Sequence, residues 1–303
     1  MANNETARNM ARGLDLADLD ETSREESDAH LVNCWENRGP LYDMYASSLM
    51  LDYGGPAFIK HHTAASFETE GELKKLSPVA RTILRATHTM SAYVMIGWET
   101  GIRNEFFVLR SVGVPARQSM EVVLFSQLYA GIRGLGHTYH AVGDFLPAYA
   151  DPKAEAEYPP GWAVDPEAFK AGLDYSVPEM TTEDRASLTA WYERTIGSVP
   201  DSITFGLKYH ADFLKANRGK WEVAIRTLPK QFAPHLMIRQ NMLSGNVEGL
   251  RESVLLAKSW GMTREIVIMG ISGAVMYFNG FEGYYTAVKA VDDLLDNWDG
   301  KVE

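Results

Sequence analysis

The chain has 303 residues, of which 46% are hydrophobic and 23% are charged, so it is long enough to bury a full core in two domains or two repeats. Its formal net charge of −11 repels nucleic acid and anionic lipid, so we expect neither as a partner. The single cysteine, Cys34, cannot form an internal disulfide, and residues 1–30 lack the apolar run of a secretion signal. These features predict a cytoplasmic protein with no membrane association.

Polar and acidic residues dominate the start of the chain, and we expect residues 1–35 to form an arm that is ordered only if it packs, for example against a neighbouring subunit. In residues 36–150 apolar side chains recur with the spacing of helix turns. Five prolines in residues 151–180 predict a linker or an extended wrap between two halves.

Residues 181–303 predict a second set of helices. Thr181 and Asp184 form a capping pattern at the start of a helix that runs through Trp191. Further helices are expected near residues 202–216, 229–244, 247–259, 263–278 and 283–298. No segment alternates apolar and polar residues as a strand does, so the sequence predicts an all-α protein.

The two halves share a series of motifs in the same order. Each has an aromatic-aliphatic-lysine motif, an amphipathic helix, a glycine turn and a long apolar helix that ends at a second glycine. The motifs are Phe58-Ile59-Lys60 and Phe213-Leu214-Lys215, then Leu76-Ser77-Pro78 and Leu228-Pro229-Lys230, then Gly113 to Gly131 and Gly261 to Gly280. A one-sided helical unit buries its apolar face by packing on its twin, so we expect two tandem units related by pseudo-two-fold symmetry.

The turn before each long helix carries a further pattern. The second copy reads Gly261-Met262-Thr263-Arg264-Glu265-Ile266, and the first copy has the same glycine spacing but Pro115 in place of threonine. This pattern resembles the carboxymuconolactone decarboxylase and alkylhydroperoxidase-D-like family, over roughly residues 55–147 and 205–298. The resemblance implies an all-helical fold of the alkylhydroperoxidase-D-like kind and a symmetric homo-oligomer.

The family's reactive residues do not carry over to this chain. Peroxidase-type members use a Cys-x-x-Cys pair followed by a histidine, and decarboxylase-type members keep the histidine and use no cofactor. Those positions fall on Trp98, Gly101 and Glu105 in the first half and on Asn246, Gly249 and Ser253 in the second. A thiol peroxidase therefore has no thiol at these positions, and the reactive groups must be sought elsewhere.

Glu105 is the first candidate for a catalytic residue. It lies three residues after Ile102 and four before Leu109, which places it on the apolar stripe of its helix. A carboxyl group buried there must find a partner or keep its proton, and a desolvated carboxyl is a good general acid or base. The alternative is a structural ion pair with an arginine such as Arg81, Arg110 or Arg133.

A second candidate site is a helix face formed by Arg133, His137, His140 and Asp144. Either histidine suits proton transfer near neutral pH, and Arg133 could hold a substrate carboxylate through two hydrogen bonds. The alternative is a solvated polar face. The same face could supply metal ligands, but no further ligand can be identified, so no metal is expected.

Two other residues are candidates for substrate binding. His88 lies at the edge of an apolar stripe, and His235 occupies the corresponding region of the second half. Tyr129 ends the long helix beside Gly131 and could line the mouth of a pocket. The alternatives are hydrogen-bonded, semi-buried histidines and a packed aromatic ring. Phosphate-binding loops and dinucleotide fingerprints are missing from the sequence, so no cofactor is expected.

The resemblance and these candidates together lead to one functional hypothesis. The chain would be a cofactor-independent lyase, decarboxylase or isomerase that acts on a small carboxylated lactone or keto acid in aromatic-compound catabolism. Glu105, His137 and His140 would move protons, while Arg133, Tyr129 and His88 would bind the substrate. The alternative is a non-catalytic member of the family that binds a small molecule or serves as a scaffold.

Overall fold

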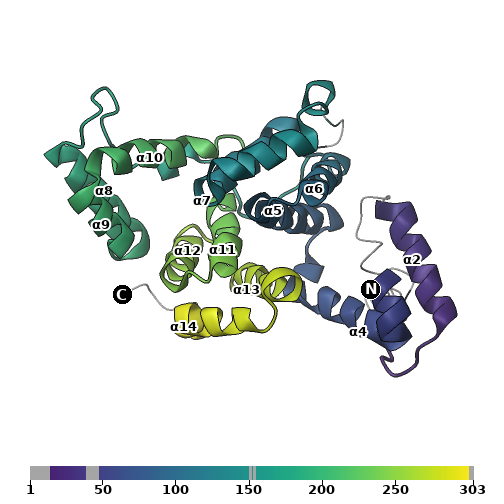
Figure 1. Cartoon of the computed structure of the whole chain (residues 1–303). Helices are drawn as coiled ribbons and strands as arrows, with labels where there is room; N and C mark the ends of the chain where they lie inside the picture. Colours follow the sequence, from purple (N-terminus) through teal and green to yellow (C-terminus); the bar gives the residue numbers. More distant parts are fainter. Residues whose placement is uncertain (1–13, 39–47, 150–151, 153–154, 300–303) are drawn as a thin grey trace. The chain divides into compact units, whose positions relative to one another are not determined.

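The computed structural model describes residues 14–38, 48–149, 152 and 155–299, together with their side chains except those of residues 34–38, so the thiol of Cys34 lies outside the described part. Within these residues every regular element is a helix and none is a strand, which confirms the predicted all-α fold (Figure 1). None of the described helices is long and apolar enough to cross a membrane. The chain divides into two compact units, Met1–Gly71 and Glu72–Glu303.

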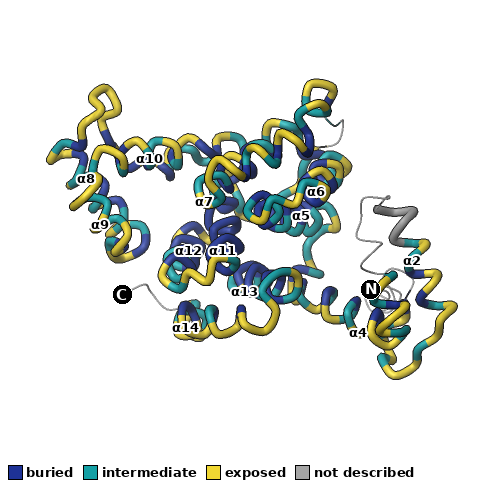
Figure 2. Tube along the Cα trace, in the orientation of Figure 1, coloured by how far each residue is buried: buried dark blue, intermediate teal, exposed yellow. Residues whose placement is uncertain are grey.

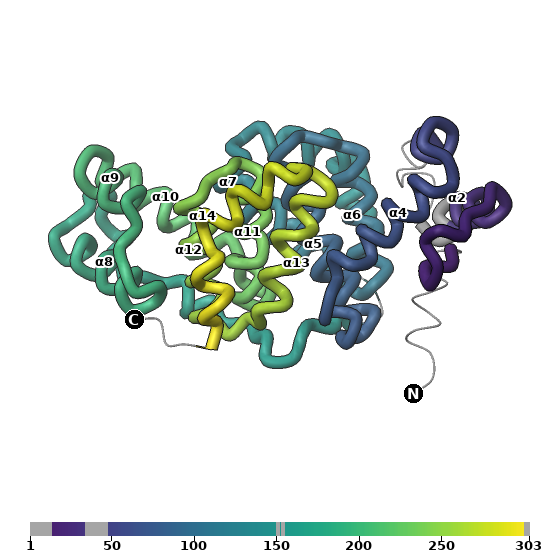
Figure 3. Tube along the Cα trace, turned by 90° about the horizontal axis from the view of Figure 1, so that it is seen from below, coloured from purple at the N-terminus to yellow at the C-terminus, as the bar shows by residue number. Residues whose placement is uncertain are grey.

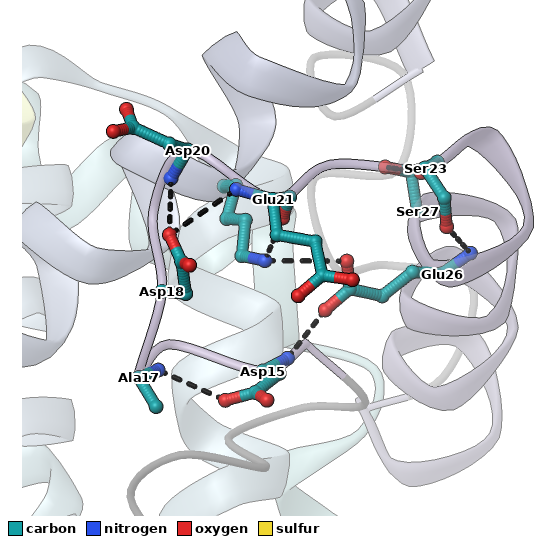
Figure 4. A network of polar contacts seen from close by, with 9 residues as sticks. Asp15, Ala17, Asp18, Asp20, Glu21, Ser23, Glu26 and Ser27 are labelled. Carbon is teal, nitrogen blue, oxygen red and sulfur yellow. Dashed lines mark hydrogen bonds and ion pairs between the residues drawn. The ribbon is translucent and has the colours of Figure 1, made fainter.

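The first unit is organised around a buried lysine. It contains α2 (Arg24–Arg38), a π-helical turn η2 (Met50–Gly54) and α4 (Gly55–Glu68). Lys60 of α4 is 2% exposed, donates to the backbone oxygen of Glu21 and pairs with Glu26 Oε2 at 3.4 Å. Figure 4 shows Glu21 and Glu26 in the polar network around this contact, where the N–H of Asp15 donates to the carboxylate of Glu26. The described part of the predicted arm is therefore attached to a helix of its own unit.

The second unit contains the same kind of anchor. Lys215 of α10 (Ala211–Ala224) is 1% exposed and donates to the backbone oxygen of Glu179 at 2.7 Å and to Asp184 Oδ2 at 2.6 Å. Asp184 and Thr181 form the predicted capping box of α8 (Thr182–Ile196). The two acceptors of each lysine have the same spacing in the chain. In each anchor the lysine donates to a backbone oxygen and to a carboxylate five residues later: Lys60 to Glu21 and Glu26, and Lys215 to Glu179 and Asp184.

The core of the second unit surrounds α11 (Phe232–Ser244). All residues from Phe232 to Met242 are buried, which is typical of a helix with neighbours on every side (Figure 2). It contacts five other helices: α5 (Pro78–Ile96), α7 (Ala116–Val142), α12 (Val247–Ser259), α13 (Arg264–Ala274) and α14 (Glu282–Asp296). Figure 3 shows α11 between α12 and α13 from a second direction. Because α11 also carries His235, Arg239 and Gln240, polar groups are enclosed in the centre of this core.

The elements around α5 and α11 occur in the same order. Both helices end at a left-handed glycine, Gly97 with φ 76° and Gly245 with φ 63°. The next helices, α6 (Glu99–Ser111) and α12 (Val247–Ser259), have 13 residues each. Each is followed by a glycine with positive φ, as the two glycine turns of the sequence predict: Gly113 with φ 90° and Gly261 with φ 75°.

The spacing between the two glycines that bound each long helical segment differs by one residue: Gly113 and Gly131 are 18 apart, and Gly261 and Gly280 are 19 apart. In the first half α7 (Ala116–Val142) is broken at Gly131, with φ 67° and ψ −174°. In the second half α13 (Arg264–Ala274) continues as the π-helix η6 (Val275–Asn279), and α14 (Glu282–Asp296) follows Gly280. A π turn holds one residue more than an α turn, so η6 accounts for the longer spacing in this copy. A two-fold relation between the halves stays a prediction.

One sequence-based expectation about the helices changes in detail. The helix expected over residues 202–216 is two helices, α9 (Asp201–Tyr209) and α10, because His210 leaves the helical region with φ −146° and ψ 48°. A side-chain carbon at Gly206 would lie 3.1 Å from Leu214, so this glycine lets α10 fold back against α9.

The proline-rich segment packs against the unit. Its short 3-10 helix η5 (Pro166–Phe169) buries Phe169, whose ring contacts Trp221 and Trp260. This favours the wrap over the free linker. Two more 3-10 turns, η3 (Gly71–Lys75) and η4 (Leu146–Ala148), complete the described elements.

Candidate functional site

Three of the six predicted site residues meet at the junction of α6 and α7. Glu99, the first residue of α6, accepts a hydrogen bond through Oε1 from Nδ1 of His137 at 2.9 Å and from Nδ1 of His140 at 3.3 Å. Arg133 donates from Nε to Nε2 of His137 at 3.3 Å. The group therefore contains one carboxylate, two imidazoles and one guanidinium, and Glu99 is the member that the sequence patterns missed.

Two glycines place these side chains. Gly97 ends α5 in the left-handed region, and a side-chain carbon there would lie 2.6 Å from the ring of His137. Only glycine therefore lets the imidazole lie against this turn. Gly131 redirects the second part of α7, so that Arg133, His137 and His140 project toward the start of α6.

Electrostatics keep Glu99 ionised. The hydrogen bond from His137 lowers the pKa of Glu99, partial burial opposes this, and His140 lowers the pKa further. The hydrogen bonds assign a proton to Nδ1 of each ring, which leaves Nε2 of each ring unprotonated; Nε2 of His137 accepts the hydrogen bond from Arg133. The side chain of His137 is 27% exposed and those of Glu99 and His140 are 42% and 67% exposed, so a solute can reach the group.

Glu105 lies outside this group. It is buried on α6, as the sequence predicts, and Asn104 donates from Nδ2 to its Oε1 at 3.4 Å. The carboxylate that accepts hydrogen bonds from both imidazoles is Glu99, and the hydrogen bond described for Glu105 comes from its neighbour Asn104.

Tyr129 and His88 belong to two other environments. Tyr129 packs on Phe125, with ring centroids 6.0 Å apart; the residue is 36% exposed, and desolvation of its hydroxyl raises the pKa of that group. Its neighbours include Tyr192 of α8 and Arg218 of α10. His88 is fully buried between α5 and α11, where its ring stacks on His235 at 4.5 Å.

The corresponding place in the second half is open. A cavity of 470 Å³ is lined by residues of α11, α12 and α14, with Asn279 at its edge. The positions that match the candidate group are Gly245, Val247, Glu282, Thr286 and Lys289, and all of them line this cavity. Nothing lies within 4 Å of a side-chain carbon built on Gly245. The first half fills this place with His137, and the second half leaves it accessible.

Among the residues that the structure describes, no group of three or more histidine, cysteine or acidic side chains has the arrangement of a metal site. Comparison with family models, with curated proteins and with solved structures finds no match for this chain. The resemblance to the carboxymuconolactone decarboxylase family thus stays a prediction. The chemistry of the site is argued from its own residues.

Proposed function

We propose that the group at the junction of α6 and α7 catalyses cofactor-independent proton transfer on a small carboxylated lactone or keto acid, as a lyase, decarboxylase or isomerase. The observation that supports this proposal is the shared hydrogen bonding of Glu99: one carboxylate oxygen holds two imidazoles, and the open nitrogen of one of them meets Arg133. Accessibility favours this group over the buried histidines, because a substrate can reach it without rearrangement of the core.

The first step of the proposed reaction is substrate binding. Arg133 offers two parallel N–H groups that match a substrate carboxylate. Binding draws the guanidinium away from His137, which frees the lone pair on Nε2. Substrate binding therefore makes Nε2 of His137 available as the base.

Proton transfer follows from the same contacts. Nε2 of His137 removes a proton from the carbon beside the substrate carbonyl, and the bonding electrons form an enol-like intermediate. The imidazolium is stabilised by the Glu99 carboxylate. In an isomerase a His140 ring that has taken a proton from solvent on Nε2 gives it to a different carbon, and His137 releases the proton it removed to solvent. In a decarboxylase no proton is removed from carbon: the carbon–carboxyl bond breaks, carbon dioxide leaves, the electron pair forms an enolate, and a ring protonated from solvent on Nε2 gives its proton to the carbon that lost the carboxyl group.

The remaining parts of the proposal concern setting and assembly. We place the protein in the cytoplasm, in aromatic-compound catabolism, as a homo-oligomer. Glu105, Tyr129 and His88 keep their proposed roles only if their variants affect turnover, because the contacts described for them are with Asn104, Phe125 and His235.

The test is a screen of muconolactones, keto acids and aromatic acids for binding and for product. With a turned-over substrate, we expect His137→Gln to lower kcat/KM by roughly 10² to 10⁴. Glu99→Gln lowers kcat because it removes the group that orients both rings, and Arg133→Ala raises KM. His61→Gln, at an exposed histidine of the first unit, is the matched control and leaves both constants unchanged.

Two outcomes would contradict the proposal. Full turnover by His137→Gln and Glu99→Gln excludes the junction as the catalytic site, and loss of turnover in Glu105→Gln alone moves catalysis to the interior of α6. Binding of these acids with no product in any condition favours the alternative, a small-molecule-binding or scaffold protein.

A further inference from the structure

Helix α9 (Asp201–Tyr209) carries apolar side chains on two opposite sides. Ile203 and Leu207 are partly buried and pack against the core of the second unit. Phe205 and Tyr209 lie on the other side, 60% and 56% exposed, with their ring centroids 4.9 Å apart. No residue of α9 is buried, and its principal neighbour is α10. A helix that is apolar all round normally lies inside a protein, so the outer side of α9 has the composition of a surface that is covered.

The exposed aromatic surface is large enough for the centre of an interface. Phe213, at the start of α10, is 70% exposed and adds a third ring close by, because the adjacent Leu214 packs on Gly206 of α9. Three rings at these exposures present roughly 300 to 450 Å² together. This is the size of the largest apolar patches on soluble proteins, which are often interaction sites. It is also about half of the area of roughly 800 Å² that each partner buries in a stable interface.

Charged side chains flank the rings of α9 in a regular order. Asp201 and Lys208 are both exposed, and they are seven residues apart, which is two turns of helix. Phe205 lies between them on the same side. Nζ of Lys208 lies 4.8 Å from the ring centroid of Tyr209, which places the positive charge at the edge of the aromatic pair. The outer side of α9 therefore has a negative end, an aromatic centre and a positive end.

We propose that α9 packs antiparallel on α9 of a second copy of this chain, across a two-fold axis. Asp201 of each copy then faces Lys208 of the other, and the axis passes between residues 204 and 205, so the two Phe205 rings meet in the centre. A two-fold contact uses the same surface on both copies, and this surface is complementary to itself in that orientation.

Charge favours a second copy over a different partner. A purely acidic or purely basic surface would leave one of the two charges of α9 opposed by a like charge, whereas a second copy matches both. The net charge of −11 opposes association of two chains in general, but Asp201 and Lys208 make this face locally neutral. The contact specifies an interface for the proposed homo-oligomer and is independent of the proton-transfer chemistry, because no residue of the α6–α7 junction belongs to it.

The first test is the mass of the full chain in solution, measured by sedimentation between about 1 and 100 µM. We expect a dimer or an even multiple of it. Phe205→Glu should raise the dissociation constant by roughly 30-fold or more, as the loss of a central aromatic anchor does, and keep the helical circular dichroism because the ring is exposed. Phe281→Glu, at a phenylalanine that is 83% exposed outside this face, is the matched control and leaves the mass unchanged.

The second test exchanges the flanking charges. Asp201→Lys and Lys208→Asp should each weaken the dimer, because each brings like charges together across the axis. The variant with both substitutions restores opposite charges in the antiparallel contact and should dimerise more strongly than either single variant. In a parallel contact the double variant would still place like charges together, so its recovery reports the orientation.

Four outcomes would overturn the proposal. A parent chain that stays monomeric at about 100 µM assigns the cover of α9 to another protein. Unchanged dimerisation of Phe205→Glu, or a double charge variant as weak as the single ones, excludes the antiparallel contact of α9. A mass that falls with Phe281→Glu and not with Phe205→Glu moves the interface to the start of α14. Loss of the dimer with full turnover, or the reverse, separates this proposal from the catalytic one.

Discussion

Glu252 on α12 is a carboxyl group whose environment opposes ionisation. Burial raises its pKa to about 7, with further contributions from Glu248 and Asp201. Its neighbours also include Tyr129 and Tyr192, whose hydroxyl groups are desolvated in the same region. The side chain is therefore half protonated near neutral pH.

This environment predicts a pH dependence of stability. A carboxyl whose pKa is higher in the folded chain stabilises the fold below the pKa of the unfolded state and loses that contribution as the pH rises to about 7. We expect Glu252→Gln to flatten the fall in Tm between about pH 4.5 and 7. Glu167→Gln, at an exposed carboxylate, leaves the profile unchanged and is the control. Parallel profiles for the parent chain and Glu252→Gln would contradict the shift.

Single residues also show what a sequence can and cannot tell about the site. The spacing of Arg133, His137 and His140 was sufficient to place them on one face, because helical neighbours follow from periodicity alone. Glu99 lies 38 residues before His137, and only the turn at Gly97 brings it there. The apolar stripe correctly predicts the burial of Glu105, but burial does not say which groups it meets.

At the scale of elements, the two lysine anchors hold helix starts in place. Lys215 and Asp184 are almost completely buried and form a hydrogen-bonded ion pair. Burial alone would raise the pKa of Asp184, but hydrogen bonds with Lys215, Asp174 and Thr181 lower it to about 2. Its contribution to stability is thus present above about pH 4 and is lost as the pH falls toward 2.

Removal of the lysine leaves this carboxylate buried and unpaired. We expect Lys215→Met to destabilise the chain by about 3 to 5 kcal/mol, measured by urea unfolding at pH 7. Lowering the pH to about 3 protonates the unpaired Asp184, so the difference between the variant and the parent chain shrinks there. Lys258→Met, at a lysine whose amine is exposed and bonds only the backbone of Asn297, is the control and changes the stability little. A small effect of Lys215→Met at pH 7 would mean that water replaces the lysine.

The break in α7 gives a second prediction for an element. Gly131 has φ 67° and ψ −174°, a conformation that is essentially restricted to glycine, so Gly131→Ala costs about 1 to 3 kcal/mol. Gly136 lies five residues later in regular helix, exposed and with nothing near its missing side chain. Gly136→Ala is therefore expected to stabilise by about 0.5 to 1 kcal/mol. Equal effects of the two substitutions in urea unfolding would show that α7 runs straight in solution.

The helix pattern of the sequence predicts α12 in full and α13 and α14 closely, because long periodic segments bounded by glycine carry strong local signals. It does not show that the extra residue before Gly280 is taken up by a π-helix, nor that His210 separates α9 from α10. Both depend on packing against other segments. The sequence also did not predict that Lys60 is an anchor. Phe58-Ile59-Lys60 resembles Phe213-Leu214-Lys215, but the segments that supply the two acceptors of each lysine have no similar sequence.

For the whole molecule, the distribution of the core predicts which part can fold alone. Every residue of the continuous buried apolar cluster, from Leu73 to Val291, belongs to the unit Glu72–Glu303. The buried pair His88 and Arg239 and the junction of α6 and α7 also belong to this unit. This unit therefore contains the apolar area that opposes the entropy cost of folding.

We expect a fragment of residues 72–303 to fold with the helix signal per residue of the full chain and a Tm within about 5 °C of it. The fragment should also keep the turnover, since it contains all residues of the α6–α7 junction. A fragment of residues 1–71 is the counterpart, and its short helices around Lys60 should be marginal alone, because a chain of this size buries little area. A fragment 72–303 that melts without cooperativity would show that its core needs the first unit, and the division at Gly71 would then not be a boundary of folding.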